Sequence, residues 1–307
     1  MNREKLVLID GNAILHRAYH ALPILTTRSG EIVNAVYGFS LMILKIIEEL
    51  KPKYLVVSFD TTSSNFRHQE FVGYKANRPK MDIELASQID RVHELVRTFN
   101  IPIIELDGFE ADDVIGTLAK QAEEKSNLEV LIVTGDKDLM QLVDDKVKLF
   151  MPTRGLSEAS EIDKQEVINK LEIIPEKVVD YKGLVGDQSD NYPGVPGIGP
   201  KTAVNLINKF GSMEELYNNL DKVESESIRQ KLEKGRESAF ISKKLAKIST
   251  DVPVKLELEK CIALDYDREK VLALFKELNF RSLSARISGE KIKTGEDKKE
   301  GDQQKLF

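Results

Sequence analysis

Short apolar runs alternate with longer amphipathic stretches over the first half of the chain. Continuous apolar runs of this length predict strands that are buried on both faces, and apolar positions three or four residues apart predict helices. The runs are 5–9, 53–59, 101–105, 128–133 and 147–151. The amphipathic stretches are 34–50, 82–99 and 110–124. Their alternation favours an α/β domain with a mainly parallel twisted sheet, flanked by helices and occupying residues 1–162.

The second half of the chain has a different pattern. Residues 163–289 predict helices and turns without a convincing strand pair, so we expect a smaller, all-helical domain there. Residues 290–307 are rich in charged residues and poor in apolar ones, which predicts a disordered tail.

Glycine and proline are concentrated in the segment 191–200. A phosphate-binding P-loop is excluded because Pro200 separates Gly199 from Lys201, and a dinucleotide fingerprint is excluded because Thr202 stands where its third glycine is needed. We expect a tight turn between helices whose free backbone amides bind phosphate near Lys201. An ordinary helix–helix connection remains the alternative.

Composition narrows the class of protein. The 307 residues are 41% hydrophobic and 31% charged, which is typical of a globular chain. The single cysteine, Cys261, excludes an internal disulfide framework, and no apolar run approaches the length of a membrane span. The net charge of −6 is unusual for a nucleic-acid protein, so the charges have to be considered by location.

Acidic residues stand where the predicted strands end. Because the carboxyl ends of parallel strands lie at one edge of a sheet, these side chains are expected to converge. Glu110 and Asp113 begin a predicted helix and share one face of it. The full set is Asp10, Asp60, Glu110, Asp112, Asp113, Asp136, Asp138, Asp187 and Asp190. Any one of them alone is more often a helix cap or a turn residue.

Together, so many carboxylates would repel one another by several kcal/mol unless cations neutralise them. Mg²⁺ or Mn²⁺ prefers such oxygen ligands, and two ions about 4 Å apart are suited to phosphodiester hydrolysis. One ion would generate hydroxide and the other would stabilise the leaving oxygen. Without the nine acids the net charge of −6 becomes +3, so a metal-loaded protein would attract phosphates.

Basic and aromatic residues are interleaved in the segment 61–81, which includes Arg67, Lys75 and Arg78. A long polar insertion after a strand is usually functional or mobile.

Several stretches, in this order along the chain, carry a family resemblance. They are Leu8–Gly11, Phe59–Asp60, Phe66–Arg67, Tyr74–Pro79, Glu110–Gly116, Thr134–Asp138, Gly186–Asn191 and Gly194–Ala203. Together they resemble the 5′-nuclease domain of bacterial DNA polymerase I and the flap-endonuclease superfamily. The resemblance implies a PIN-like core with a helical arch at about 61–98, followed by a helix-hairpin-helix element at 191–211.

The resemblance also implies an activity and a set of functional residues. It implies a structure-specific 5′-3′ exonuclease and 5′-flap endonuclease that removes primers and flaps during replication and repair. Lys75 and Arg67 would contact the scissile phosphate and Arg78 would bind DNA. Gly197, Gly199, Lys201 and Thr202 would grip the duplex backbone, with K⁺ as a further cofactor of the hairpin.

The predicted partners are DNA with 5′ flaps, nicks or 5′ ends, including RNA-primed ends, and no membrane. We expect a monomer in the bacterial cytoplasm, associated with the nucleoid. The chain stops where a polymerase region would follow in the bifunctional enzyme, so synthesis is not expected. Whether it is a free-standing nuclease or an excised domain stays open.

The last residues resemble a sliding-clamp-binding peptide through Gln303, Leu306 and Phe307. An inert disordered end is the alternative. Two other functions are also left open: a related metal-dependent ribonuclease and a non-catalytic protein that binds DNA junctions.

Overall fold

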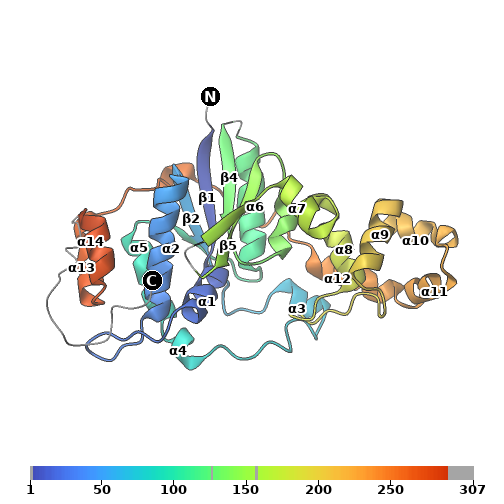
Figure 1. Cartoon of the computed structure of the whole chain (residues 1–307), viewed down its shortest axis with the longest axis horizontal. Coiled ribbons are helices and arrows are strands. Elements are labelled where there is room, and N and C mark those ends of the chain that lie inside the picture. Colours follow the sequence, from blue (N-terminus) through green and yellow to red (C-terminus); the bar gives the residue numbers. More distant parts are fainter. Residues whose placement is uncertain (1–2, 126, 156–157, 290–307) are drawn as a thin grey trace.

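The computed structural model describes residues 3–125, 127–155 and 158–289 (Figure 1). Its centre is a six-stranded sheet with the order β3-β2-β1-β4-β5-β6. All neighbouring pairs are parallel except β5 and β6, which confirms the predicted mainly parallel sheet. The strands are β1 (Glu4–Asp10), β2 (Tyr54–Ser58), β3 (Ile103–Ile104), β4 (Leu128–Val133), β5 (Val147–Arg154) and β6 (Glu158–Ile162).

Strand β1 shows why the apolar runs fold as buried strands. Alternate side chains of a strand point to opposite faces. Leu6 and Leu8 pack in the hydrophobic cluster that includes α6 (Ala111–Glu123), whereas Val7 and Ile9 pack in the cluster that includes α2 (Asn34–Leu50). Both faces of the sheet are therefore covered, and its free polar groups gather at the strand ends.

The edge of the sheet differs from the sequence prediction. Strand β6 was not predicted because its residues are mostly polar and only half-buried, as expected for an antiparallel edge strand with one wet side. Strand β3 is shorter than the predicted run and pairs with β2 through two residues only.

The helix predicted over 82–99 is two helices, α4 (Ile83–Ala86) and α5 (Ile89–Thr98). The buried side chain of Gln88 lies at the break. Its Oε1 accepts a hydrogen bond of 2.8 Å from the backbone of Ala35, and its Nε2 donates to Asn34. Gln88 thus provides a hydrogen-bond partner for the free backbone amides at the start of α2. In a continuous surface helix over 82–99, we would not expect this side chain to reach α2.

The predicted arch is only partly helical. It contains the short helix α3 (Phe66–Glu70), and turns and extended chain lead from there to α4. The backbone of Lys75 has a positive φ of 54° and its amide donates to the carbonyl of Asp190, 2.9 Å away. The segment between α3 and α4 is thus folded back against the loop that follows α8 (Val178–Val185).

The helical domain extends to one side of the sheet (Figure 1). Among the described residues from 163 onward no strand occurs, as predicted. Pro200 starts α9, and Gly211 caps its end with a φ of 86°. Besides α8, the domain contains α7 (Lys164–Leu171), α9 (Pro200–Phe210), α10 (Met213–Asn218), α11 (Glu226–Lys234) and α12 (Arg236–Ala246).

The last two helices leave this domain. Helices α13 (Arg268–Glu277) and α14 (Arg281–Ser288) lie on the opposite flank of the sheet, near α2 and α5 (Figure 1). Phe275 and Leu278 are buried in the same hydrophobic cluster as Phe39 of α2 and Phe99. The helical residues at 268–288 therefore pack with the core, although the sequence grouped them with the helical domain.

The shorter helical turns are η1 (Asp138–Leu142), η2 (Pro175–Lys177), η3 (Leu220–Lys222) and η4 (Leu258–Lys260), and α1 (Gly11–Ala21) follows β1 directly. None of the helices in the described part of the chain is long and apolar enough to cross a membrane.

Candidate active site

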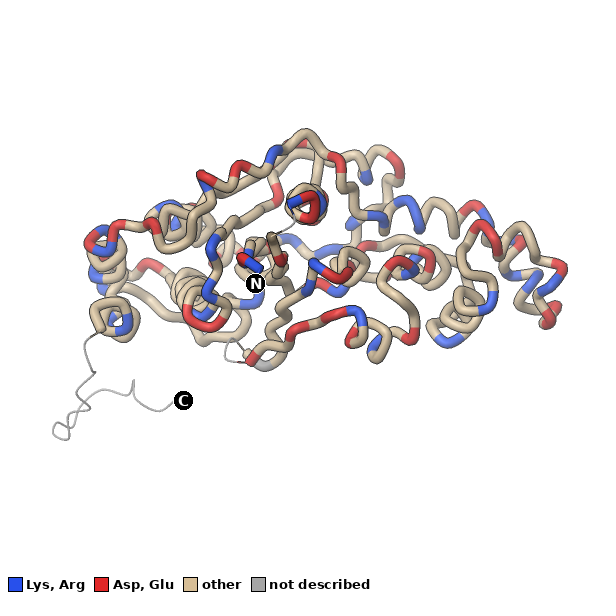
Figure 2. The backbone as a smooth tube through the Cα atoms, turned by 90° about the horizontal axis from the view of Figure 1, so that it is seen from above, with Lys and Arg blue, Asp and Glu red and all other residues tan. Residues whose placement is uncertain are grey.

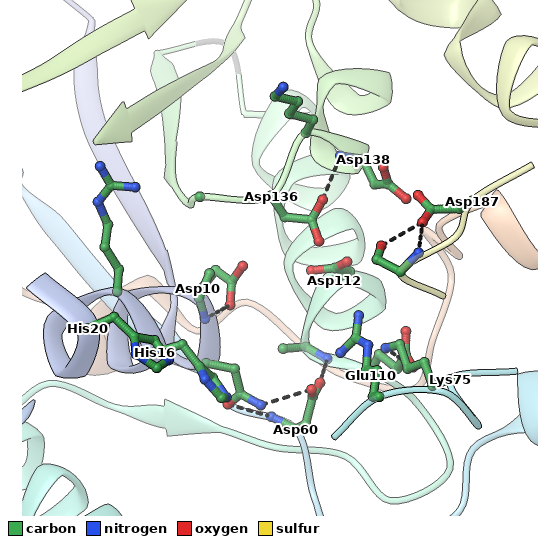
Figure 3. A pocket seen from close by; sticks show the side chains of 18 of the residues that line it. Asp10, His16, His20, Asp60, Lys75, Glu110, Asp112, Asp136, Asp138 and Asp187 are labelled. Atoms are coloured by element: carbon green, nitrogen blue, oxygen red, sulfur yellow. Dashed lines mark hydrogen bonds and ion pairs between the residues drawn. The ribbon is translucent and has the colours of Figure 1, made fainter. Parts of the chain in front are cut away.

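A pocket of about 870 Å³ opens at the carboxyl edge of the sheet. Figure 3 shows carboxylates from several elements around it. Seven of the nine predicted metal ligands line the pocket: Asp10, Asp60, Glu110, Asp112, Asp136, Asp138 and Asp187. The predicted convergence of distant acids is therefore largely present.

Asp10 joins the ends of two neighbouring strands. It caps α1 by accepting a hydrogen bond of 2.9 Å from the backbone amide of Ala13, and it accepts another of 2.7 Å from the hydroxyl of Thr134. The same hydroxyl accepts from the amide of Asp136 at 2.9 Å. This chain of hydrogen bonds sets Asp10 and Asp136 side by side at the ends of β1 and β4.

Asp60 fixes the start of α6 against the end of β2. It accepts a hydrogen bond of 2.7 Å from the backbone amide of Ala111 and another of 2.9 Å from the side-chain amide of Asn12. The next acid of the helix, Asp112, points into the pocket next to Asp136 and near Asp10 (Figure 3). Its carboxylate has no hydrogen bond or ion pair with any residue that the structure describes.

The pKa values of these acids show the cost of bringing them together. Burial, and secondarily the charges of Asp136 and Asp60, raise the pKa of Asp10 to about 7. Burial and the neighbouring Asp136 also raise the pKa of Asp138 to about 7. The pKa of Asp112 is raised well above its usual value by burial and then by Asp136 and Asp10. Desolvation and mutual repulsion therefore both act on these acids.

This donor set fits hard divalent cations. No three His, Cys, Asp or Glu side chains within the described ranges stand close enough together to enclose one ion. Mg²⁺ rarely uses an all-protein cage, because it keeps several waters and binds through one or two carboxylates plus substrate phosphates. Carboxylates spaced around an open cavity match that mode of binding, and a cation would remove the repulsion that raises their pKa values.

Glu110 lies at the rim and is neutralised by cations of the protein. Lys75 Nζ lies 2.6 Å from its carboxylate, and the hydroxyl of Tyr74 donates to it at 3.1 Å. Burial opposes ionisation, but Lys75 and Arg67 lower the pKa of Glu110 below its usual value. Lys75 also lines the pocket.

Asp113 and Arg67 lie outside the pocket, which corrects our assignment of both. The Arg67 guanidinium forms two hydrogen bonds of 2.7 Å with the Asp113 carboxylate. Asp113 is fully buried and Arg67 is 2% exposed. Glu110 and Asp113 do share a helix face, but that face packs on Arg67.

Asp187 is presented by a loop that closes on two glycines. Gly186 and Gly194 have φ of 73° and 60°, and a Cβ on Gly194 would lie 2.3 Å from the amide of Gly186. Lys182 of α8 lies 2.5 Å from Asp138 and also pairs with Asp187. Burial by itself would raise the pKa of Asp187. The hydrogen bond from Lys182 outweighs this effect and lowers the pKa to about 2. Lys182 was not among the predicted site residues. The only sequence signal for its role is its position five residues before Asp187.

Asp190 does not line the pocket. Its carboxylate pairs with Arg78 at 2.6 Å and accepts a hydrogen bond of 3.1 Å from Tyr74. Arg78 itself does line the pocket. These contacts hold the predicted arch against the loop that carries Asp187.

The predicted hairpin residues lie at the start of α9, outside the pocket. Gly197 has a φ of 82° and Gly199 is the N-cap residue of α9. Lys201 is exposed and Thr202 half-buried. Figure 2 shows basic and acidic positions interspersed along the described chain, so local placement decides where DNA could bind.

His16 and His20, four residues apart on α1, also line the pocket. Their rings stack with centroids 6.4 Å apart. The two rings therefore pack against each other on one face of α1.

The parallel sheet, the acidic pocket at its carboxyl edge and the adjoining helical domain together define a PIN-like nuclease fold. A family model described as "5'-3' exonuclease, N-terminal resolvase-like domain" matches residues 5–172. A second, "5'-3' exonuclease, C-terminal SAM fold", matches residues 173–269. The chain belongs to the 5′-3′ exonuclease family. The predicted fold class and family are thereby confirmed.

Curated relatives are bacterial polymerases. DNA polymerase I of Bacillus subtilis is 42% identical over 301 residues, which cover 98% of this chain and 33% of that protein. DNA polymerase I of Bacillus caldotenax is 45% identical over 280 residues, covering 91% and 32%. The chain therefore spans about a third of the length of these relatives.

Solved structures share the fold. The T5 D15 protein co-crystallised with metal ions has a TM-score of 0.68 at 20% identity, covering 94% of this chain and 99% of that one. The catalytic core of Rad2 in complex with a DNA substrate has a TM-score of 0.60 at 16% identity, covering 93% and 91%.

Proposed function

We propose that this nuclease hydrolyses phosphodiesters at and near the 5′ ends of DNA. It acts as a 5′-3′ exonuclease and as a 5′-flap endonuclease, and it removes primers and flaps in replication and repair. The observation that carries the proposal is Asp112, whose carboxylate lines an acidic pocket at the sheet edge without a hydrogen-bond or ion-pair partner among the described residues. A pocket of that charge is suited to paired divalent cations and a phosphodiester.

Two groups of residues would hold the cations. Asp10, Asp112 and Asp136 converge at the ends of β1 and β4, with Asp60 and Glu110 at the rim. Asp138 and Asp187 lie across the pocket, and Asp190 would join them once released from Arg78. Mg²⁺ or Mn²⁺ bound there supplies an activated water and neutralises the phosphodiester and its leaving oxygen.

Lys75 is the residue of the chain best placed to bind the scissile phosphate. Its ammonium group lies at the pocket wall and is held by Glu110 at 2.6 Å. From there it would stabilise the negative charge that builds up on the phosphoryl oxygens. Arg67 supports this arrangement indirectly, because its guanidinium holds α3 against α6 through Asp113.

The duplex would be gripped through its backbone by the start of α9. This part of the chain offers free backbone amides and one exposed cation, from Gly197, Gly199, Lys201 and Thr202. Such groups bind phosphate without reading bases. Four further expectations stay predictions. They are a K⁺ ion at this hairpin, RNA-primed 5′ ends as substrates, a monomeric state, and a location in the bacterial cytoplasm with the nucleoid. The predicted clamp-binding residues Gln303, Leu306 and Phe307 lie outside the described residues.

Cleavage of a 5′-flap DNA, with Mg²⁺ and with EDTA, tests the proposal. We expect cleavage near the junction with Mg²⁺ only. Asp136→Asn should lower the single-turnover rate by about 10³-fold or more, because it removes a ligand from the cation site. Flap binding should survive, and Asp251→Asn, a change at an exposed acid outside the pocket, should cleave normally.

Three results would contradict the proposal. Equal or faster cleavage of the matching RNA flap would indicate a ribonuclease. Binding without cleavage in Mg²⁺ and Mn²⁺ would indicate a DNA-junction binder. Full activity of the Asp136→Asn variant would remove the cation site from this pocket.

A further inference from the structure

A second, smaller cavity adjoins the acidic pocket. It has a volume of about 260 Å³ and lies between α7, α8 and the residue preceding η1. Its wall is apolar, formed by Leu171, Val178 and Val185 together with the ring of Tyr181. Sites for drug-sized ligands usually measure about 300–1,000 Å³, so this cavity accommodates a single ring system and not a whole oligonucleotide.

Two lysines connect the cavities. Lys137 and Lys182 line both of them. Lys137 stands between Asp136 and Asp138, is exposed, and its ammonium group makes no hydrogen bond or ion pair with the described residues. Lys182 is held by Asp138 and Asp187. Ammonium groups at this opening disfavour a further cation and favour a ligand that carries negative charge next to an apolar ring.

We propose that the smaller cavity is a subsite for one nucleobase, that of a nucleotide flanking the scissile phosphodiester. The base enters against the ring of Tyr181 and the three aliphatic side chains, and Lys137 contacts the phosphate beside it. This inference rests on the proposed function, since the neighbouring pocket has to hold the scissile bond. Stacking on an aromatic ring tolerates every base, which suits a nuclease that does not read sequence.

The position of Tyr181 supports this occupant. Its ring is half-buried against the core, so it is held in place, and it lines a cavity that shares Lys137 and Lys182 with the acidic pocket. A protein side chain from a partner would not use the phosphate-binding charge of Lys137. A nucleotide supplies both the ring and the charge.

A double-mutant cycle between protein and DNA tests the subsite. An abasic residue is placed on either side of the scissile bond of a 5′-flap DNA, and single-turnover cleavage is measured with the wild-type protein and with Tyr181→Leu. We expect one abasic position to slow the wild-type protein about tenfold. Tyr181→Leu should slow cleavage of intact DNA to a similar extent, with no further loss on the abasic substrate.

Two protein variants serve as controls. Tyr181→Phe keeps the ring and should still respond to the abasic position. Tyr266→Leu removes another half-buried tyrosine, which packs on Phe99 away from both cavities, and should still respond to the abasic position. Thermal melting shows whether each variant is folded.

The proposed subsite would be overturned if the rate losses from Tyr181→Leu and from the abasic residue were additive. It would also be overturned if an abasic residue on neither side of the scissile bond slowed the wild-type protein. The same cycle is also measured as equilibrium binding with Ca²⁺ in place of Mg²⁺. If intact flap DNA were not cleaved at all, the proposed function would fail by itself. The binding cycle would then decide whether a base occupies the cavity.

Discussion

Asp112 and Asp113 are neighbours on one helix, yet their surroundings are opposite. Asp113 accepts two hydrogen bonds of 2.7 Å from Arg67 and one of 2.8 Å from the backbone of Ser249, and it forms a capping box with Glu110. Asp112 has no such partner among the described residues. Consecutive helix positions are about 100° apart, so one side chain faces the interior and the other faces the pocket.

The difference separates two uses of a buried carboxylate. A buried acid with a bidentate arginine partner organises the fold, because breaking such a pair leaves an uncompensated charge. A desolvated acid without a partner lowers stability, and its presence indicates a site that is completed by a ligand. Acids alike in sequence therefore have to be assigned by their partners.

Asparagine at each of the two positions gives the largest expected contrast. Asp113→Asn removes the negative partner of buried Arg67 and should reduce the free energy of unfolding by roughly 3–5 kcal/mol. Asp112→Asn removes a repelled charge and should leave stability unchanged or higher. Urea unfolding of both variants in EDTA measures this. Equal stability losses at the two positions would refute the distinction.

The pH dependence of stability sharpens the contrast. The pKa of Asp10 is raised to about 7 by burial and its acidic neighbours, above its value near 4 in the unfolded chain. The folded state then binds the proton more tightly, so this contribution stabilises the fold below pH 4 and is lost as the pH rises towards 7. In EDTA the melting temperature should fall from pH 5 to pH 8, and Mg²⁺ should restore it at pH 8.

An Asp10→Asn variant provides the control for this titration. In EDTA at pH 8 it should melt about 2–4 °C higher than the wild type, the shift that corresponds to about 1 kcal/mol. Its response to Mg²⁺ should shrink as well. A variant that melts lower at pH 8 without Mg²⁺ would show that the hydrogen bonds from Ala13 and Thr134 outweigh the repulsion.

The sequence was most informative where one local pattern has one structural outcome. Apolar runs such as Leu6–Ile9 can be buried on both sides only as central strands, and an acid at each strand end then has to reach the same edge. The limits of α6 and β4 follow from the same reasoning. The convergence of most of the candidate acids on one pocket could therefore be predicted without coordinates.

The remaining features depend on contacts between distant residues. Arg67 meets Asp113 across 46 positions, and no local pattern distinguishes this arginine from a surface cation. The break before α5 depends on Gln88 reaching the start of α2, 53 positions away. Lys182 is a single lysine in a short helix, and only the fold brings it to Asp138.

Exposed cations provide the weakest test of the comparison. Lys201 is exposed at the start of α9, unlike buried Arg67, so its removal should hardly change stability. Lys201→Ala should weaken duplex binding about threefold and reduce the slope of log K against log salt by about 0.9, the share of one phosphate contact. Fluorescence anisotropy with two unrelated duplex sequences at several salt concentrations measures both quantities. Lys276→Ala, at an exposed position of α13 on the opposite flank, should leave them unchanged. A loss confined to one duplex sequence would mean that the hairpin reads bases and not the backbone.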